Sequence, residues 1–87
     1  MEITQEEGEF RAKTEHGDAV LRYNIKNGVM SIYHTYTPVE DRDKGIAEEL
    51  TKAAFDFAIR NELKVKPDCP YAVHFLDKHK EMQKYAV

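Results

Sequence analysis

The stretch YTPVEDRDKGIAEELTKAAF, from Tyr36 to Phe55, decides the fold because a strand ends in it and a long helix begins in it. After Pro38 the chain passes through five consecutive charged residues and reaches Gly45. Apolar residues then recur at i, i+4, i+7, i+8 and i+11, which places them on one face of a helix. They are Ile46, Leu50, Ala53, Ala54 and Phe57. The spacing predicts a helix from about Lys44 to about Asn61.

Three segments before this stretch alternate apolar and polar residues, the pattern of half-buried strands. They are EFRAKTE (residues 9–15), AVLRYNIK (19–26) and VMSIYHTYT (29–37). The dipeptide Asn27-Gly28 joins the last two and is a strong hairpin signal. Alternation in the third segment puts Met30, Ile32, His34 and Tyr36 on one face, and Val29, Ser31, Tyr33 and Thr35 on the other. These segments predict a three-stranded antiparallel meander.

The segments after the long helix are shorter. LKVKP (residues 63–67) reads as one further strand, PDCP as a turn, and YAVHFLDKHK (71–80) as a second helix with Pro70 near its start. The last residues, EMQKYAV, can pack on the sheet or form a partner-binding tail. The whole predicts a single domain over residues 1–87 with an α+β (mixed α/β) fold of meander, central helix, strand and C-terminal helix. If the strand near Val65 lies beside the one that ends at Thr37, the central helix is a right-handed crossover.

Composition narrows the class of protein. The chain has 87 residues, 41% hydrophobic and 33% charged, which suits one small globular domain. A net charge of −3 argues against nucleic-acid binding, which favours a basic surplus. No apolar run approaches the roughly 20 residues that span a bilayer, and the acidic N-terminus is unlike a signal peptide. The single cysteine excludes an internal disulfide. We therefore expect a cytoplasmic protein without membrane or nucleic-acid partners.

The charged, glycine-containing turn RDKGIA lies where the first turn of the long helix should be. That turn presents backbone N–H groups without internal partners, and the helix dipole adds positive potential, so the position can bind an anion such as phosphate. Gly45 would let an anion approach the backbone, and Arg42 and Lys44 add positive charge. Alternatively, Asp41 or Asp43 caps the helix and Gly45 is incidental. The residues by themselves leave both interpretations open.

The same six residues, Arg42 to Ala47, match the R/Q-x-x-G-x-G/A pattern between a strand and a long amphipathic helix. With HTYTP before them and P-x-C-x-Y after them, the chain resembles the Gcn5-related N-acetyltransferase superfamily, and within it the minimal, short, single-domain subfamily. The resemblance implies acetyl-CoA (coenzyme A) as ligand. It also implies that Arg42 and the backbone amides of Lys44, Gly45, Ile46 and Ala47 receive the CoA pyrophosphate. Asp43 departs from relatives that carry glycine there, and its carboxylate would repel the pyrophosphate unless it points away or pairs with Arg42 or Lys44.

The resemblance also suggests residues for acetyl transfer. The acetyl group would enter a gap between the third and fourth predicted strands, where backbone N–H groups around Thr35, Tyr36 and Thr37 would polarise the thioester carbonyl. His34 is a candidate base, because its ordinary pKa lies near neutrality; the alternative is a hydrogen-bonded strand histidine. Cys69 is a candidate nucleophile, or a small buried apolar residue. Tyr71 could protonate the CoA thiolate or pack in the core.

No metal site is expected, since His74 and His79 are five residues apart and fall on different helical faces, and His16 lies in a predicted solvated turn. The leading interpretation is an acetyl-CoA-dependent N-acetyltransferase acting on an amine of unknown identity. An exposed polypeptide amine or a polyamine would suit the open acceptor side of so short a chain. The alternative is a non-catalytic CoA-binding or protein-interaction module with the same fold. Both a monomer and a homodimer are compatible with the sequence.

Overall fold

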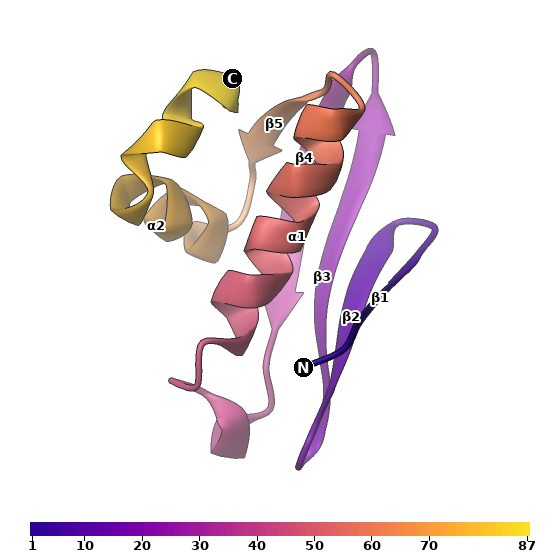
Figure 1. Ribbon diagram of the computed structural model, residues 1–87, viewed down its shortest axis with the longest axis vertical. Helices are drawn as coiled ribbons and strands as arrows, with labels where there is room; N and C mark the ends of the chain where they lie inside the picture. The colour runs from indigo at the N-terminus through magenta and orange to yellow at the C-terminus, as the bar shows by residue number, and fades with distance from the viewer.

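A five-stranded sheet in the order β1-β2-β3-β4-β5 forms one layer of the computed structural model, which describes all 87 residues. The strands β1 (Ile3–Glu6), β2 (Glu9–Thr14), β3 (Gly17–Lys26) and β4 (Val29–Tyr36) form an antiparallel meander, and β5 (Lys64–Pro67) pairs parallel with β4. Helix α1 (Ile46–Arg60) crosses one face of the sheet, and α2 (Pro70–Lys78) lies beside it at the β5 edge (Figure 1). The predicted mixed α/β fold is confirmed.

The meander has one strand more than predicted. Strand β1 pairs with β2 from Ile3↔Ala12 to Glu6↔Glu9, and Gln5 donates a hydrogen bond to the Tyr23 hydroxyl at 2.9 Å. Three of its four residues are exposed, so the strand carries almost no apolar alternation for sequence reasoning to find. Backbone pairing with β2 provides the order that burial does not.

Helix α1 begins at Ile46, two residues later than predicted, because Gly45 adopts a left-handed conformation (φ 80°) that a helix cannot contain. Its C-terminal end is a Schellman motif: the Leu63 N–H donates to the Ala58 carbonyl at 2.8 Å across a left-handed Glu62 (φ 56°). Neither α1 nor α2 combines the length and the apolar composition that crossing a bilayer requires.

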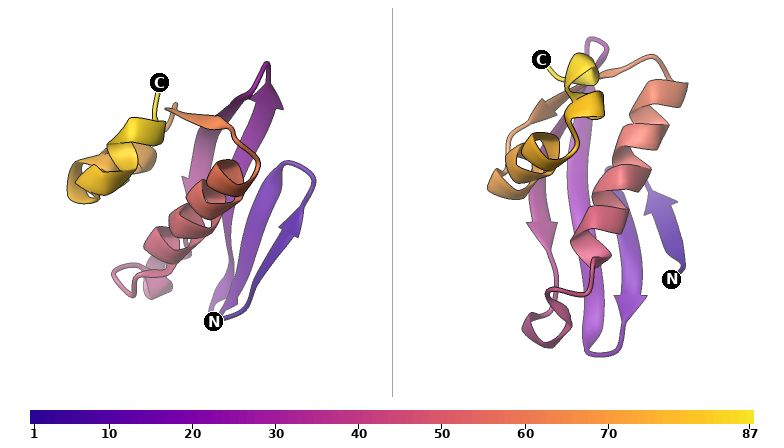
Figure 2. Two further views of the ribbon diagram at one scale, coloured as in Figure 1. Left: turned by 45° about the horizontal axis from the view of Figure 1, so that its top comes forward. Right: turned by 60° about the vertical axis from the view of Figure 1, so that its left-hand side comes forward.

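The core lies between the sheet and the two helices, as the views in Figure 2 show. Phe55 of α1 and Phe75 of α2 are fully buried and stack with their ring centroids 5.3 Å apart, so the two helices meet through aromatic side chains. Phe57 extends the core to the other side, where its ring meets those of Phe10 and Tyr23. Truncating a buried phenylalanine to alanine costs about 3–5 kcal/mol, so this packing accounts for much of a small domain's stability.

A β-bulge in β4 changes which side chains face the core. Arg22 pairs with His34, but the next residue of β3, Tyr23, pairs with Ile32, which leaves Tyr33 as an extra residue in β4. Thr35, opposite the buried Leu21, therefore continues the helix-covered face of Ile32. The prediction that His34 and Tyr36 share a face with Met30 and Ile32 is wrong, because one inserted residue reverses the alternation beyond it.

The C-terminal segment packs against the sheet. After the 3₁₀ helix η2 (Lys80–Tyr85), the Val87 N–H donates to the Val65 carbonyl at 2.9 Å, and Ala86 forms a parallel bridge with Val65. Met82 and Ala86 also pack on the core cluster. Of the two predicted alternatives for EMQKYAV, the structure shows the packed one, and the segment covers the β5 edge of the sheet.

Candidate functional site

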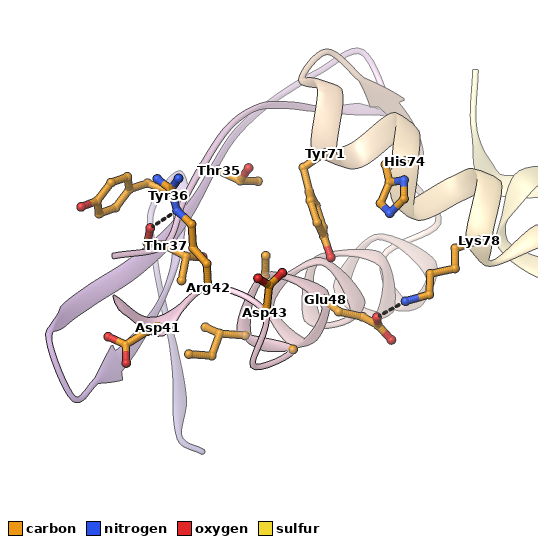
Figure 3. A pocket seen from close by; sticks show the side chains of 13 residues that line it. Thr35, Tyr36, Thr37, Asp41, Arg42, Asp43, Glu48, Tyr71, His74 and Lys78 are labelled. Carbon is orange, nitrogen blue, oxygen red and sulfur yellow. Dashed lines mark hydrogen bonds and ion pairs between the residues drawn. The ribbon is translucent and has the colours of Figure 1, made fainter. Parts of the chain in front are cut away.

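A cavity of about 570 Å³ opens where β4 ends and α1 begins. Residues 35–37 of β4 and its end form one wall, residues 41–43 and 45–48 form the second, and α2 closes the third with Tyr71, His74 and Lys78 (Figure 3). Every residue predicted to bind the cofactor lines this one cavity except Lys44. The structure thus brings residues 71–78 of α2 beside the end of β4 and the start of α1, which are themselves close in the sequence.

The first turn of α1 contributes free backbone donors to the cavity. The first hydrogen bond of the helix runs from the Glu49 N–H to the Gly45 carbonyl at 3.1 Å, and no side chain caps the helix. The N–H groups of Ile46, Ala47 and Glu48 therefore have no partner within the protein. The alternative prediction that an aspartate caps this helix is wrong, since Gly45 occupies the N-cap position and neither neighbouring carboxylate bonds to it.

Arg42 and Asp43 bring opposite charges to the same wall. The Arg42 Nε donates to the Thr37 carbonyl at 3.0 Å, which leaves the terminal guanidinium nitrogens available for a ligand. Asp43 is exposed, lines the cavity and adopts a left-handed backbone conformation (φ 66°). It forms no ion pair with Arg42 or Lys44, so its charge stays uncompensated at the cavity.

Lys44 points elsewhere, because it pairs with the buried carboxylate of Asp41 at 3.0 Å. Asp41 is 1% exposed and also accepts hydrogen bonds from the Thr14 hydroxyl at 2.8 Å and the His16 backbone N–H at 3.0 Å. Burial by itself would raise the pKa of Asp41, but the bonds from Lys44, Thr14 and His16 outweigh it and hold the pKa well below its usual range. Lys44 is therefore tied to the protein and not presented to the cavity.

His16 lies in the turn between β2 and β3 and is exposed, as predicted, and its Nδ1 also lies 3.1 Å from Asp41 Oδ1. Glu15, His16 and Asp41 bring potential metal-ligand atoms within 4.8 Å of one another. The Asp41 oxygens are, however, already occupied by bonds from Thr14, His16 and Lys44. This cluster is explained by hydrogen bonding within the protein.

On the α2 side, Tyr71 extends from the helix toward the start of α1 (Figure 3). Partial burial, together with the negative charge of Glu48, raises the pKa of the Tyr71 hydroxyl, which keeps its proton throughout the neutral range. Glu48 itself pairs with Lys78 at 3.2 Å and with the His79 Nε2 at 3.4 Å. The Lys78 bond holds the pKa of Glu48 below its usual range and joins the start of α1 to the end of α2.

The two predicted catalytic residues do not line the cavity. His34 is exposed on the face of the sheet away from the helices, opposite Arg22. Cys69 is 6% exposed, belongs to the core cluster, and accepts the first backbone bonds of α2 from Ala72 and Val73. Its thiol therefore occupies the setting of a small apolar side chain.

A family model described as GCN5-related N-acetyl-transferase matches residues 9–85. The chain belongs to this family. Protein NATD1 of Bos taurus is 36% identical over 62 residues, which are 70% of this chain and 55% of that protein. Protein NATD1 of Danio rerio is 32% identical over 75 residues, 85% of this chain and 68% of that protein. The chain thus spans about half of the length of the Bos taurus relative and two thirds of the Danio rerio one.

Among solved structures, this N-acetyltransferase-family chain is similar to the NMR solution structure of a GCN5-like protein from Staphylococcus aureus. The two superpose with a TM-score of 0.76 at 28% sequence identity, over 99% of this chain and 87% of the other. The fold seen here is therefore that of the family across the whole chain.

Sequence reasoning missed Glu48, His74 and Lys78 among the residues that line the cavity. His74 and Lys78 follow the predicted Tyr71 at i+3 and i+7 and so share its face of α2, a spacing that was visible in the sequence. Glu48 directly follows the glycine motif, yet nothing in the sequence indicated that Lys78 and His79 would lie beside its carboxylate. Only the packing of α2 beside α1 brings these three side chains together.

Proposed function

We propose that this chain is an acetyl-CoA-dependent N-acetyltransferase whose cofactor site is the cavity between β4, α1 and α2. The observation that carries the proposal is the set of free N–H groups of Ile46, Ala47 and Glu48 opening into that cavity. Helix N-termini of this kind bind phosphate groups through their amides and their dipole. The cavity volume of about 570 Å³ lies within the range of ligand-binding pockets.

The lining residues fit a pyrophosphate. A Cβ built on Gly45 would meet nothing within 4 Å, so the backbone there is open to an approaching anion. Arg42 adds a guanidinium whose position is set by its bond to the Thr37 carbonyl. We propose that these amides and Arg42 hold the pyrophosphate, while Lys44 balances Asp41 and makes no direct contact.

The end of β4 supplies the donors for the reacting carbonyl. Pairing between β4 and β5 stops at Ile32↔Pro67, and the last bond across it runs from the Asp68 N–H to the Ile32 carbonyl at 2.9 Å. Beyond that point β4 has no neighbour on its β5 side, and residues 35–37 line the cavity. Backbone N–H groups of this segment are our proposed oxyanion donors.

When bound, acetyl-CoA would supply the acetyl group as a thioester. Attack by an amine nitrogen would form the C–N bond and break the C–S bond, with one proton passing from the amine to a base and one taken up by the sulfur. Tyr71 is the proposed donor of that proton, because its hydroxyl lies in the cavity and stays protonated at neutral pH. His34 remains a proposed base, reached from the uncovered face of the sheet. An acetyl-cysteine at Cys69 would require the buried thiol to become accessible.

A non-catalytic CoA-binding module is the second candidate. The positions of His34 and Cys69 outside the cavity, together with the unpaired charge of Asp43, favour it. In this alternative the same amides and Arg42 bind CoA, but no group accepts a proton from the amine.

Isothermal titration of the purified chain with CoA tests the proposal, followed by incubation with acetyl-CoA and a panel of peptide amines and polyamines. Saturable one-site binding with an acetylated amine product supports the enzyme. Binding without any product over the panel supports the module. A gain of one acetyl group by the protein, lost in Cys69→Ala, would establish an acyl-enzyme. The absence of any binding heat, with no protection against thermal unfolding, would overturn both candidates.

A further inference from the structure

Asp41 is a buried carboxylate that the proposed transfer chemistry does not use. It lies in the 3₁₀ helix η1 (Val39–Asp41), directly before the loop that presents Arg42 and Gly45 to the cavity. Its side chain turns toward the β2–β3 turn, where it meets Thr14 and His16. Figure 3 shows it apart from the Glu48 and Lys78 side chains at the other side of the cavity.

The contacts of Asp41 join two segments that are distant in the sequence. Oδ2 accepts from the Thr14 hydroxyl and the His16 N–H, at 2.8 and 3.0 Å, while Oδ1 accepts from Lys44 Nζ at 3.0 Å. A buried carboxylate is tolerated only when such donors replace its hydration, so all these partners are held together. One side chain thus links the loop before α1 to the β2–β3 turn.

Few other bonds fix this loop. The Arg42 Nε bond to the Thr37 carbonyl holds one end, and the Glu49 N–H bond to the Gly45 carbonyl holds the other. Residues 43–45 donate no backbone hydrogen bond, and Asp43 and Gly45 have left-handed φ values of 66° and 80°. Glycine adopts such values freely, but Asp43 keeps its conformation only where its surroundings impose it. The bond from Lys44, between these two residues, is therefore the main restraint on the loop between Arg42 and the start of α1.

We propose that Asp41 is the positioning residue of the loop before α1: by anchoring Lys44 to the β2–β3 turn it holds the amides of Ile46, Ala47 and Glu48 in the ligand-receiving arrangement before the ligand arrives. The inference rests on the proposed CoA binding. A pre-ordered loop avoids the ordering cost that a mobile loop would add to every binding event. The β2–β3 turn, which lines no part of the cavity that binds the pyrophosphate, then contributes to CoA affinity through this carboxylate.

The test compares variants on both sides of Asp41 without touching the cavity lining. Thr14→Val removes one donor from the turn, with Thr4→Val as a matched control on an exposed strand. Lys44→Met removes the loop side of the anchor, and Lys44→Arg preserves a cationic donor. Each variant is measured for CoA affinity by titration, for backbone ¹⁵N NMR order parameters over residues 42–47, which report disorder without requiring hydrogen-bonded amides, and for thermal unfolding.

We expect Thr14→Val and Lys44→Met each to lower the order parameters over residues 42–47 and to raise the Kd for CoA about tenfold, the equivalent of one hydrogen bond. Lys44→Arg and Thr4→Val should leave the Kd within about twofold. Thr14 and Lys44 act through the same carboxylate, so their effects should not be independent. The Kd of the double variant Thr14→Val/Lys44→Met should therefore rise by less than the product of the two single rises.

Four results are decisive. Lower loop order parameters together with weaker CoA binding in the two anchor variants support the proposal. Unchanged order parameters and unchanged Kd in both variants, while the wild type binds CoA, overturn the positioning role and leave the proposed function standing. A wild type that does not bind CoA overturns the proposed function and the inference with it. A rise in Kd confined to Lys44→Met, with normal loop order parameters, would instead make Lys44 a direct ligand and also overturn the inference.

Discussion

Two turns of this molecule use the same unusual backbone for opposite purposes. In the hairpin turn between β3 and β4, Asn27 (φ 52°) and Gly28 (φ 78°) adopt left-handed conformations. In the loop before α1, Asp43 (φ 66°) and Gly45 (φ 80°) do the same. The hairpin turn joins β3 to β4 at Lys26↔Val29, and the Gly28 carbonyl accepts a bond from the Lys64 N–H at 3.0 Å. The loop before α1 leaves the first helical N–H groups without partners.

The difference lies in what surrounds each turn. Strands on both sides of the hairpin turn use its polar groups, so it contributes to the fold alone. The loop before α1 ends at the open start of a helix, so its amides face a cavity. A built Cβ on Gly28 or on Gly45 would meet nothing within 4 Å. The two glycines are therefore matched sites at which the backbone cost is the same and only the function differs.

Gly45→Glu should have the largest effect and separate the two turns most clearly. A carboxylate in front of the free amides would repel the CoA pyrophosphate, and we expect a loss of affinity of at least about a hundredfold in titration. Gly28→Glu is the control. Both variants should lose about 1–2 kcal/mol of unfolding free energy in urea, because both force a side chain into the left-handed region. Equal CoA affinity in the two variants would remove the proposed role of the turn before α1.

Tyr71→Phe tests whether a side chain of the cavity beside the loop before α1 takes part in acetyl transfer. We expect kcat to fall about a hundredfold while the Kd for CoA stays constant, because the hydroxyl acts only on the leaving sulfur. Since the pKa of Tyr71 is raised, its ionisation should not limit the wild-type rate until the pH exceeds the ordinary tyrosine value of about 10. Tyr33→Phe, at an exposed tyrosine outside the cavity, is the control. An equal loss in both variants would exclude the acid role.

Asp43→Gly should increase the CoA affinity of the loop before α1. Removing the carboxylate relieves repulsion of about 1 kcal/mol, so CoA affinity should improve roughly fivefold, and relief of the left-handed residue should add about 0.5–1 kcal/mol of stability. Asp43→Asn changes the charge alone. Glu62→Gly relieves a left-handed residue at the other end of α1 and should stabilise the protein without changing CoA affinity. Weaker CoA binding by Asp43→Gly would show that the carboxylate assists the ligand.

Acid should loosen the loop before α1 at a higher pH than it loosens the hairpin turn between β3 and β4. The pKa of Asp41 is lower in the folded protein than in the unfolded chain, so its stabilising effect is complete above the ordinary value near 3.8 and is lost as the pH falls through the folded pKa. Backbone ¹⁵N order parameters should therefore fall at residues 42–47 below about pH 4 while those of residues 26–29 stay constant. Simultaneous loss at both turns would show global unfolding in place of local release.

Much of the fold was predictable because it depends on local periodicity. Alternation identified β2, β3 and β4, the Asn27-Gly28 pair identified the hairpin, and the helical spacing after Gly45 identified α1. The match to the family pattern at Arg42–Ala47 led to the residues that line the cavity. Strand β1 escaped prediction because three of its four residues are exposed. The bulge at Tyr33 escaped because a single inserted residue leaves no mark on composition.

The sequence by itself determined the order and type of most elements, the hairpin and the position of the charged, glycine-containing turn, since each follows from the conformational preferences of neighbouring residues. Only the tertiary structure decided which side chains meet. His34 lies outside the cavity, and Lys44 pairs with the buried Asp41. Cys69 lies in the core, and Tyr71 lies in the cavity near the start of α1. These outcomes depend on strand register, burial and charge pairing between segments far apart in the chain, which no local pattern records.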